Sequence, residues 1–171
     1  RGVRRIAVAY RVAASGPGGG FAVAFPRPGA GCPSGPDAKG VALQALVATG
    51  NDCPAVKAGT WLTAHQQADG SFANKAVDPS KPATANVNST AYAALGLVAG
   101  GQSTSKILGY LSSVQNSDGG LAVNPGSGIT KSDVFATSQA LNAFAGSSFL
   151  TLGPSPIPVK TLACTPTPSG T

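Results

Sequence analysis

The sequence KAGTWLTAHQQADGSF, at residues 57–72, occurs a second time in altered form as KILGYLSSVQNSDGGL, at residues 106–121. Each copy contains an aromatic-Leu pair, a Gln four residues after that Leu and an Asp-Gly dipeptide. This pattern predicts a helix that ends in an Asp-Gly turn. The motif positions are Trp61, Gln66, Asp69, Gly70, Phe72, Tyr110, Gln115, Asp118 and Gly119.

The residue types of the motif suit a structural role and not a catalytic one. Trp61 is expected to bury one end of the helix. Gln66 lies near the C-terminal turn, where backbone carbonyls lack partners, and its amide is expected to donate to them. Asp69 and Gly70 then reverse the chain, and Phe72 folds an apolar group back onto the hairpin. These residues are therefore predicted to be structural.

A second pattern recurs around the first. The segments DAKGVALQALVATG, NSTAYAALGLVAGG and DVFATSQALNAFAG occupy residues 37–50, 88–101 and 133–146. Each is predicted to be a helix that opens on an N-cap (Asp37, Asn88 or Asp133) and ends in Gly. Asn88 also begins a glycosylation sequon, but the cap is the favoured interpretation. A helical hairpin of about 50 residues therefore repeats.

Composition divides the chain into three zones. Residues 1–36 are Gly- and Pro-rich and hold all five Arg and no acid, a charge of +5. They are either a basic arm or a stretch that is not native to the domain. Residues 37–150 hold the repeats, and residues 151–171 read as a Pro/Thr-rich linker through which a following segment would attach to a cell surface. Residues 37–171 carry seven Lys and six Asp, so no nucleic-acid partner is expected.

The two turn motifs resemble the QW repeats of squalene-hopene and oxidosqualene cyclases, found in the prenyltransferase/squalene oxidase repeat family. The likeness covers residues 36–147, although Phe72 and Leu121 replace the usual closing Trp. It implies an all-α fold in which helical hairpin repeats form part of an (α/α) toroid. About two and a half hairpins are present. Cobalamin carriers of the intrinsic-factor type share this toroid and its loose motifs.

The chemistry of the family's enzymes is missing from the sequence. No Asp-x-Asp-Asp acid motif occurs, and the chain has no Glu for a thioester motif. His65 is the only histidine and is interpreted as a helix-end residue, so no zinc site and no cofactor are expected. The three cysteines, Cys32, Cys53 and Cys164, allow one disulfide in an exported protein, or they are unrelated thiols.

Three aromatic residues on the proposed inner helices are candidate ligand contacts. The alternative is that they are ordinary residues of the hydrophobic core. They are Tyr92, Phe135 and Phe144. We therefore expect a non-catalytic binding module for an apolar or cofactor-like small molecule, extracellular or at the cell surface. The alternatives are a fragment of a terpenoid cyclase whose acid motif lies elsewhere, and a structural repeat or gene remnant without a ligand.

Overall fold

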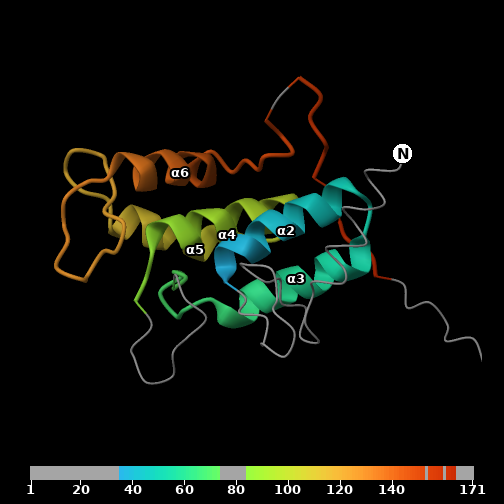
Figure 1. Ribbon diagram of the computed structural model, residues 1–171, viewed down its shortest axis with the longest axis horizontal. Coiled ribbons are helices and arrows are strands. Elements are labelled where there is room, and N and C mark those ends of the chain that lie inside the picture. Colours follow the sequence, from blue (N-terminus) through green and yellow to red (C-terminus); the bar gives the residue numbers. More distant parts are fainter. Residues whose placement is uncertain (1–34, 74–83, 153, 160, 165–171) are drawn as a thin grey trace, which may run out of the picture.

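A computed structural model describes residues 35–73, 84–152, 154–159 and 161–164 (Figure 1). These residues form five helices and, apart from isolated bridges, no strand. The predicted all-α class is therefore confirmed for this part of the chain. The helices are α2 (Pro36–Ala48), α3 (Asp52–His65), α4 (Val87–Ala99), α5 (Ser105–Ser113) and α6 (Val134–Phe144).

The helices pack around α4. Helix α4 lies between α2 and α6, while α3 packs against α2 and α4, and α5 against α4 and α6 (Figure 1). The core contains side chains of all five helices, together with Phe72 and Leu121 from the segments that follow α3 and α5. Helix α4 is the centre of this arrangement, since most of its residues are buried.

Small residues set the distance between α2 and α4. A Cβ atom added to Gly40 would lie 2.0 Å from the Tyr92 carbonyl oxygen, and one added to Gly96 would lie 2.7 Å from the Cα of Gly40. Both distances are far below a van der Waals contact, so the two backbones approach as closely as they do only because these positions are glycine.

The start of α2 differs from the prediction. Asp37 was expected to be the N-cap, but Gly35 occupies that place and Pro36 is the first helical residue. The fixed φ of proline suits the first turn of a helix, where its missing N–H costs nothing. Asp37 therefore lies inside the first turn, and burial raises the pKa of its carboxyl group.

The start of α4 also differs, whereas that of α6 is as predicted. Asn86, not Asn88, caps α4, and its side chain accepts a hydrogen bond of 2.9 Å from the Ser89 N–H. Asp133 caps α6 and accepts from the Ala136 N–H at 2.7 Å. The predicted cap at Asn88 is therefore wrong by two residues, a common error when a short polar segment offers several capping side chains.

The helix ends follow the prediction. Gly50, Gly101 and Gly146 come shortly after α2, α4 and α6 and have φ angles of 72°, 68° and 59°. The left-handed region is the one that glycine enters without steric cost.

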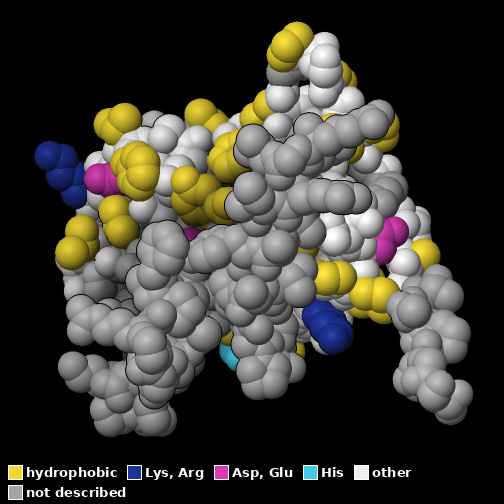
Figure 2. Space-filling view, turned by 45° about the vertical axis from the view of Figure 1, so that its right-hand side comes forward, with side chains coloured by type: hydrophobic (Ala, Val, Ile, Leu, Met, Phe, Trp, Pro, Cys, Tyr) yellow, Lys and Arg dark blue, Asp and Glu magenta, His cyan; other side chains and the backbone are white. Residues whose placement is uncertain are grey.

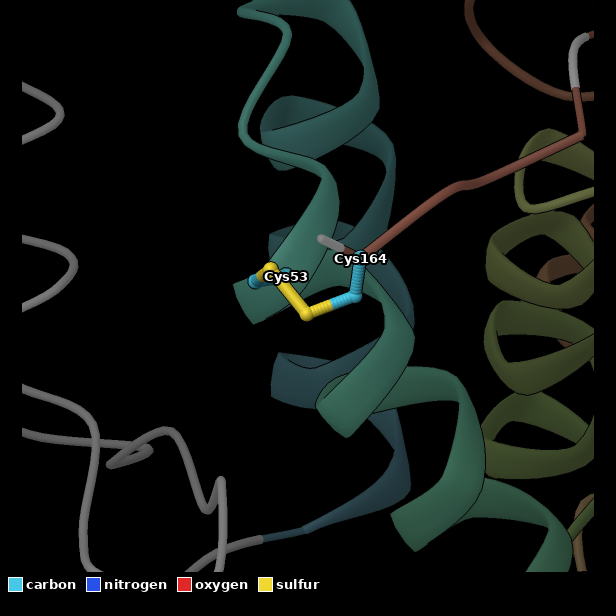
Figure 3. The surroundings of a disulfide bond; sticks show 2 residues. All are labelled: Cys53 and Cys164. Carbon is cyan, nitrogen blue, oxygen red and sulfur yellow. A yellow bond between two sulfur atoms is a disulfide. The ribbon is translucent and has the colours of Figure 1, made fainter. Parts of the chain in front are cut away.

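The chain after α6 returns to α3. Cys164 forms a disulfide with Cys53 at the start of α3, with 4.4 Å between the two Cα atoms (Figure 3). On the way, the Ile157 N–H donates to the Leu150 carbonyl oxygen at 2.7 Å, and Leu162 packs partly against the core. The predicted linker contains no helix or strand where it is described, but turns at Thr151 and bends at Leu152, and the disulfide fastens it to α3.

Two predictions fall on residues that the structure does not describe. One is the basic zone at residues 1–36, which is described only from residue 35, and the other is the pairing of Cys32. Within the described part of the chain, no helix is both long and apolar enough to cross a lipid bilayer.

Candidate functional site

The two turn motifs have matching hydrogen bonds. The Gln66 side-chain amide donates to the Gly70 carbonyl oxygen at 3.0 Å, and that of Gln115 donates to the Gly119 oxygen at 2.8 Å. Gly70 and Gly119 have φ angles of 95° and 83°, as expected for Asp-Gly turns. Each glutamine thus bonds the turn itself and not the last helix carbonyls. The reason is that Gln66 already has an extended backbone, which carries its side chain past the helix end.

The two aspartates accept hydrogen bonds from backbone N–H groups of the same turns. One carboxylate oxygen of Asp69 accepts from the Ser71 N–H at 2.9 Å, and the matching oxygen of Asp118 accepts from the Gly120 N–H at 2.9 Å. Asp118 also accepts from the Ser132 hydroxyl at 2.7 Å, and these bonds lower the pKa of its carboxyl group. Both aspartates are therefore occupied as acceptors within their own loops.

Each turn is fastened to the helix that follows it. The Phe72 N–H donates to the Thr90 hydroxyl at 3.0 Å, and the Leu121 N–H donates to the Thr137 hydroxyl at 2.9 Å. Phe72 has no exposed surface, so its side chain folds back into the core as predicted. These contacts lie within the fold, and the structural role of the motif residues stays a prediction.

The aromatic positions of the motif differ in their surroundings. Trp61 is half-buried and stacks on His65, with ring centroids 3.8 Å apart, and the Nζ of Lys39 lies 4.6 Å from the Trp61 ring centroid. The His65 Nδ1 donates to the Trp61 carbonyl oxygen at 2.8 Å, in the last turn of α3. Tyr110 is buried, and this burial, together with the charge of Asp69, raises its pKa to about 12.

The three predicted ligand contacts lie in different places. Tyr92 meets Phe149 edge to face at 6.2 Å, and its hydroxyl accepts from the Gln139 side chain at 3.3 Å. Phe135 is 62% exposed at the start of α6, and Phe144 is 36% exposed at its end. Of these three aromatics, only Phe135 lines the groove described next.

An open groove of about 720 Å³ lies beside the start of α6. Its apolar wall combines Phe135 and Val134 of α6 with Val123 and Ile129 of the preceding loop. Its polar residues are Lys131, Ser132, Asp133 and Ser138. This volume falls in the range of small-molecule sites, which are mostly apolar with a few polar groups. Figure 2 shows hydrophobic side chains gathered on the upper left of the molecule, where α6 lies.

The polar groups of the groove are held in place by the loop. Asp133 is engaged by the cap of α6, and the Ser132 hydroxyl is fixed between Asp118 and the side-chain amide of Asn116. Lys131 is exposed at the rim. Among the described residues, no group of three or more His, Cys, Asp and Glu side chains is placed to hold a metal ion.

No protein-family model matches the chain, and no curated protein sequence matches it either. The geometry described above is therefore the basis for the function proposed below.

Sequence reasoning missed the loop half of the groove. Val123, Ile129 and Lys131 lie between the second turn motif and α6, in a stretch without helical periodicity. The signal available was the presence of two β-branched apolar residues in a loop that is otherwise short of large apolar side chains. Lys39, buried beside Trp61, was missed as well, because a lysine on a helix is usually on its exposed face.

Proposed function

We propose that this chain is a non-catalytic binding module for an apolar or cofactor-like small molecule, held in the groove beside the start of α6. The supporting observation is the wall formed by Val123, Ile129, Val134 and Phe135, of which Ile129, Val134 and Phe135 remain exposed to solvent. Exposed large apolar side chains that converge on one hollow are unusual in a monomer surface and typically mark a binding site.

The proposal includes an architecture. The described helices form part of an (α/α) toroid of hairpin repeats, related to the prenyltransferase/squalene oxidase repeat family. In support, α2, α4 and α6 form one row, with α3 and α5 packed against it. The equal hydrogen bonds of Gln66 and Gln115, and of Thr90 and Thr137, further support a repeated unit.

The proposal also includes an exported location, extracellular or at the cell surface. Cys53 and Cys164 are joined in a disulfide although their separation in sequence is 111. Such bonds form and persist in oxidising compartments and are rare where thiols are kept reduced. The location can be tested by mass spectrometry of the natural protein: a mass lower by two hydrogen atoms per chain supports export, and a fully reduced chain opposes it.

The binding proposal can be tested with 8-anilinonaphthalene-1-sulfonate as a fluorescent probe of the groove. Displacement of the probe by palmitate, squalene or cobalamin then identifies the class of ligand. We expect Phe135→Ser to weaken probe binding about tenfold, the effect of losing about 1.4 kcal/mol of apolar contact. Phe149→Ser is the matched control, since Phe149 is 47% exposed and is not among the groove residues.

Two results would contradict the binding proposal. Equal weakening by Phe135→Ser and Phe149→Ser would mean that the probe binds exposed apolar surface in general. Binding of the probe without displacement by any of the three ligands would rule out the ligand classes named here and favour a structural repeat.

A further inference from the structure

The chain after α6 has two parts that are attached to the helices in different ways. The first part is residues 147–152, in which Ser148 has no exposed surface. The Phe149 N–H donates to the side-chain oxygen of Gln44, a buried residue of α2, at 2.8 Å. Leu150 packs partly against the core. The first part is therefore attached to the helices by its own contacts.

The second part is residues 154–159 and 161–164, which we name the distal strap. Every residue of the distal strap except Leu162 is exposed. A Cβ placed on Gly100, after the end of α4, would lie 3.6 Å from the Cδ1 of Leu162 and 3.6 Å from the Cδ2 of Leu43. Leu162 therefore lies where the end of α4 meets α2.

Two bonds also hold the distal strap. The Ile157 N–H donates to the Leu150 carbonyl oxygen, which links the distal strap to the first part and not to a helix. The disulfide joins Cys164 to Cys53 in the first turn of α3 (Figure 3). Among the described residues, the distal strap makes no further hydrogen bond. Its attachments to the helices are thus one leucine side chain and one disulfide.

The disulfide is the stronger of these two attachments. The apolar contact of one half-buried leucine is smaller than the conformational entropy that the ordered residues of the distal strap lose. The bond from Ile157 to Leu150 adds little, because both residues can exchange it for bonds to water. Without the disulfide, the distal strap is therefore expected to leave the helices, while residues 147–152 keep their contacts.

The disulfide is open to attack from solvent. Cys164 is exposed and Cys53 is half-buried, so a thiolate can reach the Sγ of Cys164. Attack there breaks the bond to Cys53, which leaves as a thiolate, and the second thiol of the same dithiol then displaces Cys164. The products are two cysteine thiols and the dithiol in its disulfide form. Exchange with a small-molecule disulfide reverses both steps.

We propose that the Cys53–Cys164 disulfide is a redox-operated clasp. In the oxidised chain the distal strap lies over Gly100 and Leu43. In the chain reduced by a dithiol, the distal strap is released and the five helices remain packed, since Leu162 is the only distal-strap residue that packs against the core. This inference does not depend on the proposed ligand site, because no residue of the distal strap lines the groove.

The test is nitrogen-15 relaxation of the full chain in a Cys32→Ser background, with and without dithiothreitol. In the oxidised chain the backbone amides of Leu162 and Ala163 should have order parameters of about 0.85, the value of rigid backbone. In the reduced chain they should fall below about 0.6. The amides of Phe149 and of Leu95 in α4 should keep their values. Removing dithiothreitol and adding oxidised glutathione should restore the order of Leu162 and Ala163.

Two variants separate the disulfide from the leucine contact. Cys164→Ser should release the distal strap without any reductant, and dithiothreitol should then change nothing. Leu162→Ser keeps the disulfide, so the Ala163 amide should stay ordered until dithiothreitol is added. Loss of order at Ala163 in oxidised Leu162→Ser would assign the attachment to the leucine and overturn the inference.

Three further results would overturn the inference. The first is a disulfide that dithiothreitol leaves intact in the folded protein, as measured by alkylation and mass spectrometry. The second is a reduced chain in which Leu162 and Ala163 stay ordered, because other contacts would then hold the distal strap. The third is a loss of order at Leb95 together with Leu162, because the disulfide would then hold the whole fold and not the distal strap.

Discussion

Helices α4 and α6 share the same local chemistry and differ in what surrounds them. Ten of the 13 residues of α4 are buried, against three of the 11 residues of α6. Both helices nevertheless begin with a capping side chain, and both receive the N–H of the preceding turn on a threonine hydroxyl. The short-range pattern therefore forms with or without full coverage, and burial depends on the neighbouring helix.

The two turn motifs show the same difference. A Cβ at Gly70 would lie 2.2 Å from the Lys106 carbonyl oxygen of α5, whereas a Cβ at Gly119 meets nothing within 4 Å. The first turn is thus covered by the next hairpin and the second is open. Residues at the same position of a sequence motif can therefore contribute differently to the free energy of unfolding. The following predictions compare such residues.

The largest effect is expected from the disulfide. Replacing both Cys53 and Cys164 by Ser removes a cross-link that closes a loop of more than 100 residues, worth about 4 kcal/mol in the chain-entropy account. Because few residues of α6 are buried, we expect hydrogen exchange to accelerate more in α6 than in α4. Urea unfolding measures the first quantity and exchange mass spectrometry the second. A loss below about 1 kcal/mol would contradict this view of the disulfide.

A smaller loss is expected at the contact of α2 and α4. Gly40→Ala places a methyl group against the Tyr92 backbone and must push the helices apart, at a cost of about 3 kcal/mol. Gly109→Ala is the control, since Gly109 lies on the exposed side of α5 and a Cβ there would meet no atom within 4 Å. Alanine there should stabilise the helix by about 0.5–1 kcal/mol. Thermal unfolding of the pair checks both signs, and equal effects would contradict the close approach.

Lys39 is expected to make stability depend on pH. Burial lowers its pKa from 10.5 to about 8, so between these values the unfolded chain holds more protons than the folded one. Stability should therefore rise by about 2 kcal/mol from pH 7 to pH 10. Above pH 10 it should fall, because the pKa of Tyr110 is raised to about 12 and the unfolded tyrosine ionises first.

The pH prediction is checked by urea unfolding across pH 7–12 in a Cys32→Ser background, which limits thiol exchange. In Lys39→Met the rise below pH 10 should vanish while the fall above it remains. A profile that is unchanged in Lys39→Met would assign the rise to another group.

The smallest effects compare two threonines. Thr90→Val leaves the buried Phe72 N–H without its acceptor and should cost about 2 kcal/mol. Thr137→Val removes the matching bond to Leu121, but Thr137 is only half-buried, so water can replace the hydroxyl and the cost should stay below about 1 kcal/mol. Chemical denaturation of both variants tests this order, and a larger loss for Thr137→Val would reverse it.

The sequence was sufficient to predict the features that depend on neighbouring residues. The Asp-Gly turns at Asp69 and Asp118, the cap at Asp133 and the glycines after α2, α4 and α6 all follow from spacing and turn chemistry. The cap of α4 was misplaced because Asn86 and Asn88 are equally good candidates locally. Only the bond from Ser89 to Asn86 distinguishes them.

Features that depend on distant residues were beyond the sequence. Spacing alone did not distinguish a bonded Cys53–Cys164 pair from unrelated thiols, since a sequence separation of 111 carries no signal. Tyr92 of α4 and Phe135 of α6 are both aromatic residues of predicted helices, yet Phe135 lines the groove and Tyr92 contacts Phe149. Their environments follow from which face of each helix a neighbour covers.

The most direct test of the account compares Ala94→Lys with Leu141→Lys by urea unfolding. Ala94 and Leu141 each lie eight residues after the cap of their helix, Asn86 or Asp133. Ala94 has no exposed surface, so a lysine there should cost more than about 3 kcal/mol. Leu141 is 61% exposed, so the same change should stay within about 0.5 kcal/mol. Equal losses at the two positions would contradict the claim that α6 is the uncovered counterpart of α4.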